Sequence, residues 1–184
     1  MDDLCGAEAV AAPGVQGFDG VLHGRSLPRG EGAETPIGQD VPMHTSPQQI
    51  RLSRDGTLHE ATVSWWLTDD GFAVEIVCDA LGAGAHRAHA SDAFEALCLL
   101  REGLEPQGWR VGVVGARIDV WPSGMARDQG GGQVAYRWEG RDPVDRVDTF
   151  APSDPAATVT VAEQQGTIEA RVGAPMRAAP PSPG

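Results

Sequence analysis

Residues 48–79, QQIRLSRDGTLHEATVSWWLTDDGFAVEIVCD, decide the fold of this chain. Apolar and polar side chains alternate through most of this stretch, and two Asp-Gly pairs, Asp55-Gly56 and Asp70-Gly71, interrupt it. Such alternation is typical of half-buried β-strands, and Asp and Gly tolerate the positive φ angles of a tight hairpin turn. The stretch therefore predicts three antiparallel strands joined by two short turns.

The pairing that these turns imply agrees with a single buried face. A two-residue turn at Asp55-Gly56 places Arg51 opposite Glu60 on the outer face and leaves Leu52 on the inner face. A two-residue turn at Asp70-Gly71 gives only apolar pairs, which share the inner face with Phe72: Leu67 with Val74, Trp65 with Ile76, and Val63 with Cys78. Register and burial thus support the same meander.

Trp66 breaks the alternation, because it points to the outer face beside Thr62, Ser64 and Glu75. Two interpretations stay open. The indole is covered by the N-terminal segment or by packing at the sheet margin, or it contacts a partner, since Trp is enriched at the energetic centres of protein interfaces.

Residues 90–109, ASDAFEALCLLREGLEPQGW, predict a helix that covers the inner face of the meander. Ser91 is the expected N-cap, Asp92 suits the positive end of the helix dipole, and Pro106 with Gly108 ends the helix. The apolar side is expected to hold Ala93, Phe94, Leu97, Cys98, Leu100 and Leu104, and the solvent side Glu95, Arg101, Glu102 and Glu105.

Two further strands and a second helix complete the predicted fold. Residues 109–121 are expected to form a strand with Val114, Ala116, Ile118 and Val120 on one face, and residues 133–139 a strand with Val134, Tyr136 and Trp138 on one side. Residues 153–172 are ambiguous: Ser153-Asp154-Pro155 favours a helix start, whereas the β-branched residues 158–161 favour a strand, and we interpret the segment as helix. The prediction is an α+β domain, β-β-β-α-β-β-α, with a mostly antiparallel five-stranded sheet and helices on one face.

Composition divides the chain into three parts. Residues 1–47 are rich in Gly, Pro and acidic residues and residues 173–184 are rich in Pro, so both are expected to be disordered around a single domain at 48–172. The net charge of −12 is shared as −5, −8 and +1 among these parts in chain order. An acidic domain repels phosphate backbones, which argues against nucleic-acid binding. The negative charge either keeps the protein soluble or attracts a basic protein partner.

Other features of composition indicate a cytoplasmic bacterial protein. Lys is absent and all fourteen basic residues are Arg, which is typical of a GC-rich coding sequence. The first residues, MDDLCGAEAVAAPG, have neither a basic nor an apolar region of a signal peptide, and no apolar run is long enough for a membrane span. Cys5, Cys78 and Cys98 form no CxxC pair, which favours a reducing compartment, and Cys98 is expected in the core.

The loop between Trp121 and Gln133 is longer than an ordinary hairpin connection and has several interpretations. Gly130, Gly131 and Gly132 would form an anion-binding nest with Arg127, Ser123 would be a nucleophile, or Met125, Arg127 and Asp128 would contact a protein. The plain alternative is a flexible loop in which Arg117, Asp119, Arg127 and Asp128 pair locally. The stretch has no phosphate-binding or GxSxG spacing, so the first two are the weakest.

No metal, cofactor or catalytic group is expected. His86, His89 and Asp92 are spaced by three residues, which suits metal ligation only on a continuous helical turn. Glycines at 82 and 84 and the Ser91 cap place both histidines in a loop before the helix. We therefore expect a solvated pair of histidines there.

The run GARIDVWPSGMARDQGGG at 115–132 resembles a block of small, uncharacterised bacterial proteins. In these a helix similar to DAFEAL…LEPQGW precedes the block and a segment similar to VDTF…DP…TVAEQ follows it. The likeness covers about residues 48–165. It implies that the loop is a regular part of the domain and that residues 1–47 are an extension. It assigns a catalytic role to no residue.

The sequence favours a non-catalytic, cytoplasmic protein-binding module of the immunity or adaptor type, with a protein partner and no contact with membrane or nucleic acid. The expected contact surface comprises Trp66, Arg117, Asp119, Trp121, Ser123, Met125, Arg127 and Asp128. The alternative is a small enzyme or a nucleotide- or phosphate-binding protein that uses the 117–132 loop. A self-associating subunit, a homo-oligomer, is the third interpretation.

Overall fold

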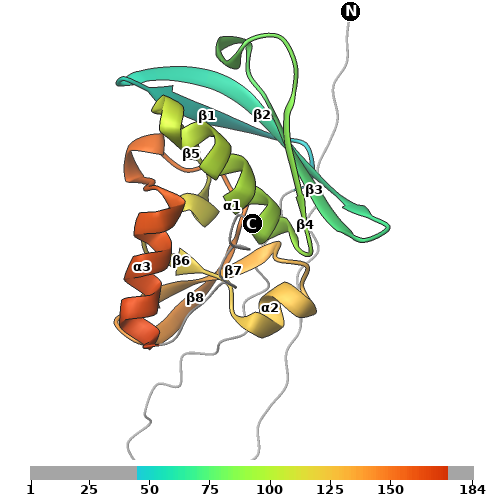
Figure 1. The fold of residues 1–184 in the computed structure, drawn as a ribbon. Coiled ribbons are helices and arrows are strands. Elements are labelled where there is room, and N and C mark those ends of the chain that lie inside the picture. Colours follow the sequence, from blue (N-terminus) through green and yellow to red (C-terminus); the bar gives the residue numbers. More distant parts are fainter. Residues whose placement is uncertain (1–44, 174–184) are drawn as a thin grey trace, which may run out of the picture. The chain divides into compact units, whose positions relative to one another are not determined.

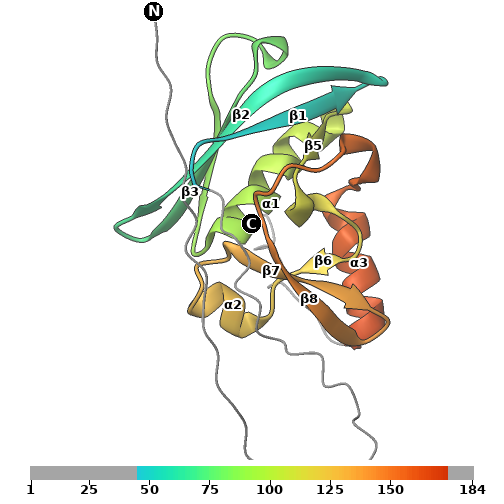
Figure 2. The ribbon, with the colours of Figure 1, turned by 180° about the vertical axis from the view of Figure 1, so that it is seen from behind.

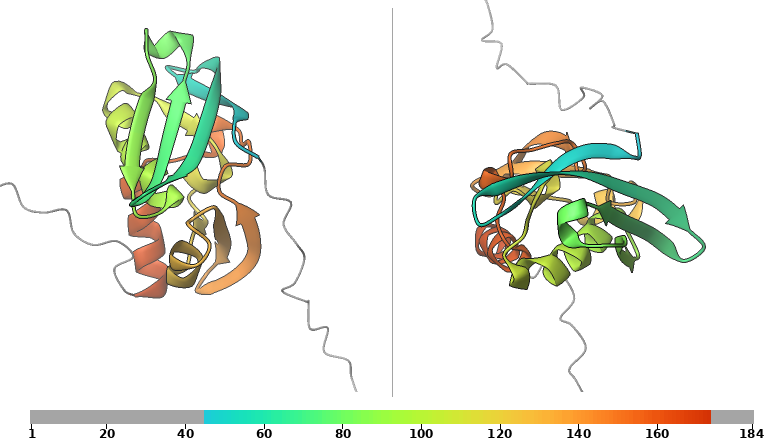
Figure 3. Two further views of the ribbon diagram at one scale, coloured as in Figure 1. Left: turned by 90° about the vertical axis from the view of Figure 1, so that its right-hand side faces the viewer. Right: turned by 90° about the horizontal axis from the view of Figure 1, so that it is seen from above.

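The computed structural model describes residues 45–173 and shows an α+β arrangement with two antiparallel sheets (Figure 1). The five-stranded sheet has the order β4-β3-β2-β1-β5, and Figure 3 shows its strands side by side. Its strands are β1 (Gln48–Arg54), β2 (Thr57–Thr68), β3 (Gly71–Val77), β4 (His86–Ala90) and β5 (Arg110–Gly112). The three-stranded sheet, β6-β7-β8, comprises β6 (Val120–Trp121), β7 (Val134–Glu139) and β8 (Asp142–Asp148).

The helices are α1 (Ala93–Leu104), α2 (Gly124–Asp128) and α3 (Val161–Val172), with single 3₁₀ turns at η1 (Asp79–Leu81), η2 (Glu105–Gln107), η3 (Val114–Ala116) and η4 (Pro155–Ala157). The predicted α+β class is confirmed, but the predicted element order and sheet are wrong in detail. The five-stranded sheet contains β4 and β5, and residues 133–139 belong to the second sheet as β7. The sequence prediction missed β4, β8 and α2.

Helix α1 lies between the two sheets, as views from opposite sides show (Figures 1 and 2). One side of α1 packs into the core beneath the five-stranded sheet, with Leu97 and Leu100 among the buried residues. The other side places Phe94 and Cys98 in a second core with Trp121 and other residues of the smaller sheet and α3. The helix therefore has two apolar sides, and the interpretation of Cys98 as a core residue is confirmed.

The predicted register of the first hairpin is confirmed, since Arg51 pairs with Glu60 across β1 and β2. The second register is shifted by two residues: Trp65 pairs with Val74, and Thr68 pairs with Gly71. The turn therefore uses residues 69–70. Gly71 is needed for a different reason, because a Cβ there would lie 2.1 Å from the Ala90 backbone oxygen.

The shift by two keeps each side chain on its predicted face, because strand side chains alternate with a period of two. Val63, Trp65, Val74, Ile76 and Cys78 are buried as expected. Leu67 is the exception. It is 70 % exposed, because it lies near the hairpin tip.

Two further expectations about α1 are wrong: the identity of its N-cap and the exposure of Arg101. The N-cap is Asp92 and not Ser91, since the Asp92 carboxylate accepts a hydrogen bond from the Glu95 backbone nitrogen at 2.9 Å. Arg101 was expected toward solvent, but it is buried. Its guanidinium donates to Gln164 Oε1 at 2.7 Å and to the Val159 carbonyl at 2.6 Å, which ties α1 to α3.

Residues 109–121 do not form the continuous strand that was predicted, because the 3₁₀ turn η3 separates β5 from β6. Two glycines explain the break. A Cβ on Gly112 would lie 2.5 Å from the Arg51 carbonyl oxygen, and one on Gly115 would lie 2.8 Å from the Thr149 carbonyl oxygen. Gly112 is the last residue of β5, where it pairs with Arg51 at close range, and Gly115 lies in the 3₁₀ turn against Thr149.

The helix predicted within residues 153–172 is confirmed, but it begins at Val161. Thr160 is its N-cap, and a capping box joins Thr160 with Glu163. The Asp154-Pro155 start belongs to the 3₁₀ turn η4, and Thr158 and Thr160 have extended backbone, as their β-branching favours.

The predicted extension 1–47 and tail 173–184 lie outside the described residues except at their inner ends. Within residues 45–173, the helices are all too short or too polar to cross a bilayer.

Candidate binding surface

Trp66 lies on the outer face of the five-stranded sheet, opposite the core, and 37 % of its surface is exposed. Its cross-strand partner on β3 is Ala73, which is buried although it also faces outward. The indole of Trp66 covers Ala73 and explains its burial, because the Cβ atoms of facing residues on adjacent strands lie about 5 Å apart. The indole therefore rests on the sheet surface and keeps part of its area open to solvent.

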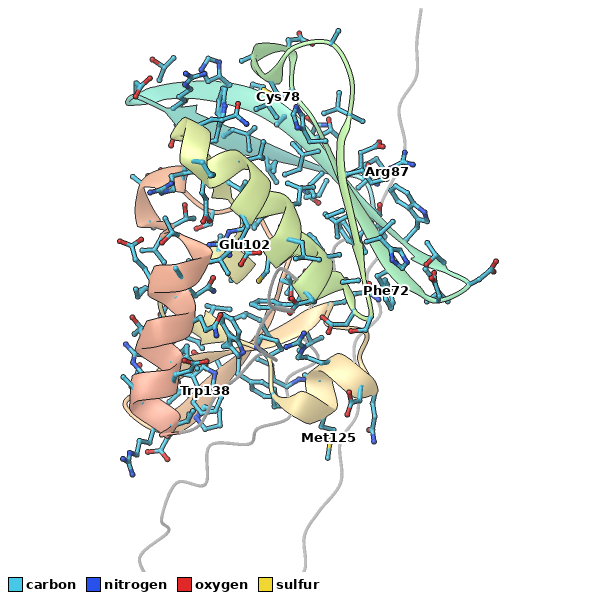
Figure 4. All side chains as sticks on the ribbon, viewed as in Figure 1. Phe72, Cys78, Arg87, Glu102, Met125 and Trp138 are labelled. Carbon is cyan, nitrogen blue, oxygen red and sulfur yellow. The ribbon has the colours of Figure 1, made fainter. Side chains whose placement is uncertain are left out.

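Arg87 on β4 holds the indole in this position. Its guanidinium carbon lies 5.0 Å from the centroid of a Trp66 ring, within the range of a cation–π contact. Its Nε and Nη2 atoms donate to Glu75 Oε2 at 3.1 and 2.5 Å. Figure 4 shows Arg87 on the side of β4 that faces away from α1. We call Trp66, Glu75 and Arg87 the Trp66 patch.

The residues of the Trp66 patch lie on three neighbouring strands, β2, β3 and β4. The pairing of these strands therefore sets the geometry of the patch. Glu75 and Arg87 are direct cross-strand partners in the β3–β4 register. Sequence reasoning missed Arg87, because the segment before α1 was interpreted as a loop. The signal was the alternation in HRAHA at 86–90, which places Arg87 and His89 together on one face once the segment is a strand.

His89 forms the border of the patch near the hairpin tip. Its Nε2 lies 2.7 Å from Thr68 Oγ1 and 3.0 Å from Asp70 Oδ1. The predicted loop position of the two histidines is wrong, and because His86 and His89 differ in strand parity they face opposite sides of the sheet. Within residues 45–173, no three His, Cys, Asp or Glu side chains are grouped so that they would hold a metal ion.

The loop that the sequence singled out is used mainly for packing within the domain. Ser123 Oγ accepts a hydrogen bond from the Ala126 backbone nitrogen at 3.2 Å and caps the short helix α2. Trp121 is fully buried, with its ring edge-on to Phe94 at 5.0 Å, and it offers no contact surface. Among the side chains of residues 45–173, its Nε1 is the buried nitrogen without a hydrogen-bond partner.

Arg127 binds the first turn of α1, far from its own loop in the sequence. Its Nε donates to Asp92 Oδ2 at 2.8 Å, and its Nη2 donates to Glu95 Oε2 at 2.7 Å. Burial disfavours the charge, but the hydrogen bonds to the two carboxylates outweigh it and raise the pKa of Arg127. The expected local pairing is confirmed for Arg117, whose Nε lies 3.1 Å from Asp119 Oδ1.

The glycines of the loop fit tightly between α1 and the sheet. The Gly131 carbonyl accepts a hydrogen bond from the Ala93 nitrogen at 2.8 Å, which satisfies a donor at the start of α1. A Cβ on Gly132 would lie 2.4 Å from Asp92 Oδ1. A carboxylate at this place disfavours the anion-binding nest, because an incoming phosphate would meet like charge.

The remaining predicted contact residues differ in exposure. Met125 is 68 % exposed, Asp128 is exposed, and Arg117 and Asp119 are half-buried. Ser123 also borders a pocket of about 290 Å³ formed mainly by β7 and β8, with Tyr136, Trp138, Pro143, Val144 and Asp145.

No protein-family model matches this chain, and no curated protein matches it in sequence. The resemblance to small bacterial proteins therefore stays a prediction, and the functional assignment depends on the geometry of the surface.

Proposed function

We propose that this chain is a non-catalytic protein-binding module of the immunity or adaptor type, and that its partner covers the Trp66 patch. The observation that supports the proposal most directly is the restraint on an exposed indole: Arg87 stacks on Trp66 while Glu75 fixes Arg87. A side chain held in place before binding loses little conformational entropy in the complex. Trp and Arg are also the residues that most often dominate interface energies.

The exposed part of Trp66 is large enough to matter. A Trp buries up to about 250 Å², so the exposed 37 % corresponds to about 90 Å². At about 25 cal/mol per Å², its removal from water contributes about 2 kcal/mol to a complex. This is the loss that defines an interface hot spot in alanine substitutions.

The other candidate function, phosphate or nucleotide binding at the 117–132 loop, receives less support. Its strongest cation, Arg127, already binds Asp92 and Glu95, and the Gly132 backbone lies against Asp92. An anionic ligand would have to displace these carboxylates. We therefore prefer the outer face of the sheet as the functional surface.

The proposal is tested by affinity capture from native lysate with the wild type, Trp66→Ala and Leu58→Ala as baits, followed by titration of each purified partner. Leu58 is the matched control, because it is exposed on the same face but lies at the other end of β2. We expect Trp66→Ala to weaken binding about thirtyfold and Leu58→Ala to leave it nearly unchanged.

Thermal unfolding of each variant separates lost binding from lost folding. If a purified partner binds Trp66→Ala as tightly as the wild type, the Trp66 patch is not the interface. If both substitutions weaken binding equally, the interface is not centred on Trp66.

A further inference from the structure

A shallow groove of about 660 Å³ runs along α3 on the surface of the domain. Its lining includes Ile118 and Val159 together with residues of α3, among them Ala162, Gly166, Thr167 and Ala170. The ends carry charge, with Glu163 near the start of the helix and Arg171 near its end. We call this surface the α3 groove. It is distinct from the Trp66 patch, which lies on β2, β3 and β4.

Within residues 45–173, no packing contact requires a glycine at position 166. It lies in the middle of a twelve-residue helix, where glycine costs about 1 kcal/mol relative to alanine. A Cβ at this position would meet no atom within 4 Å, in contrast to Gly112 and Gly115, which the fold requires. A helix surface without this Cβ permits another backbone to approach closely.

The charges at the two ends identify the occupant. Glu163, Thr167 and Arg171 are spaced by four residues and follow one line along the helix. When a second α3 lies antiparallel with the two-fold axis beside Thr167, Glu163 of each copy faces Arg171 of the other. An interface with such a two-fold axis is self-complementary and makes each ion pair twice.

Both charged side chains are already held at the ends of the α3 groove. Glu163 Oε2 accepts hydrogen bonds from the Thr160 nitrogen and hydroxyl at 2.9 and 2.8 Å. Arg171 Nη1 donates to the Trp138 carbonyl at 2.9 Å. A guanidinium has five N–H donors, so Arg171 retains donors for a carboxylate across the interface.

We propose that the α3 groove binds a second copy of this chain, with the two α3 helices antiparallel and Glu163 paired with Arg171 of the other copy. The dimer is independent of partner binding at the Trp66 patch. A single helix pair gives a small interface, so the expected affinity is modest and the dimer dissociates on dilution.

Charge exchange tests the proposal in the full-length chain. Sedimentation velocity over a wide range of concentration is expected to show a monomer–dimer equilibrium for the wild type. Glu163→Arg and Arg171→Glu each place like charges at both ends of the groove and are expected to weaken dimerisation at least about tenfold. An equimolar mixture of the two variants restores opposite charges and is expected to form a heterodimer.

A second pair of variants tests the close approach. Gly166→Leu is expected to abolish the dimer, whereas Gly103→Leu is the control, because Gly103 lies exposed in α1 and a Cβ there would also meet no atom within 4 Å. Circular dichroism checks that each variant is folded. The proposal is overturned if the wild type stays monomeric at every concentration, if the mixture fails to associate, or if Gly166→Leu dimerises like the wild type.

Discussion

Arg127 and Asp92 are separated by 35 residues in the chain, yet Arg127 Nε donates to Asp92 Oδ2 at 2.8 Å. Asp92 is also the N-cap of α1, and Glu95 in the first turn accepts from the same guanidinium. The positive end of the α1 dipole thus faces two carboxylates, which in turn hold the loop that contains α2. These contacts join the loop that contains α2, the most unusual stretch of the sequence, to α1, the helix that contributes side chains to both cores.

Replacing Arg127 is expected to destabilise the domain. Arg127→Ala leaves the mostly buried Asp92 without its counter-ion, and we expect the free energy of unfolding to fall by about 2 kcal/mol. Arg117→Ala is the control, because its pair with Asp119 is more exposed and is expected to contribute less than about 1 kcal/mol. Urea unfolding measures both. Equal losses would mean that Arg127 has no structural role beyond that of a surface ion pair.

Alanine substitutions at Gly132 and Gly140 distinguish the cost of a steric clash from the cost of backbone strain. Both have positive φ, +70° and +60°, so an alanine is strained at either position by about 1 kcal/mol. Only Gly132 also meets a close atom, Asp92 Oδ1 at 2.4 Å. We expect Gly132→Ala to lower the unfolding free energy by at least about 1 kcal/mol more than Gly140→Ala does. Similar losses would show that the loop can move away from α1.

Arg101 is a buried cation whose bonds connect α1 with α3. Its burial lowers the pKa of the guanidinium, an effect that the nearby Glu105 opposes. Arg101→Met removes the donors to Gln164 and Val159, and we expect a loss of about 3 kcal/mol. Arg110→Met, at a half-buried site on β5, is expected to cost less than about 1 kcal/mol. Chemical unfolding measures the free energy of unfolding of both variants. Equal losses would contradict a structural role of Arg101 between α1 and α3.

The capping box of α3 predicts a dependence on pH. Hydrogen bonds from Thr160 lower the pKa of Glu163 below its ordinary value of 4.5, so its contribution is present above that value and is lost as pH falls through the folded pKa. Glu163→Ala is expected to reduce stability at neutral pH by no more than about 0.5 kcal/mol, because the carboxylate is exposed. In melts at low protein concentration, the difference from the wild type should shrink as pH falls below 4.5 and through the lowered pKa of Glu163. A constant difference would exclude this linkage.

Local patterns were sufficient to predict much of the fold. The β1–β2 register followed from Asp55-Gly56, whereas the second turn was misplaced because Gly71 is required by the Ala90 carbonyl and not by the turn. Strand β4 was missed because its neighbours are turn-forming residues and its side chains are small or polar. A contact between distant segments, which no local pattern encodes, decides the second turn, whereas the alternation in HRAHA at 86–90 was a local signal for β4 that was overlooked.

The candidate site shows the same limit. The outward position of Trp66 follows from parity alone, and the structure agrees. Its neighbour Arg87 depends on the pairing of β3 with β4, and the burial of Trp121 depends on α1 and α3. Trp121 was therefore expected at the contact surface because its packing partners are far away in the chain.

Hydroxyl-radical footprinting of a purified complex tests the central claim most directly, because Trp66 and Met125 both have readily oxidised side chains and both are exposed in the free domain. Mass spectrometry then measures the oxidation of each residue with and without the partner. The account predicts that the partner protects Trp66 and leaves Met125 as reactive as before. Protection of Met125 with no change at Trp66 would assign the interface to the 122–132 loop and contradict it.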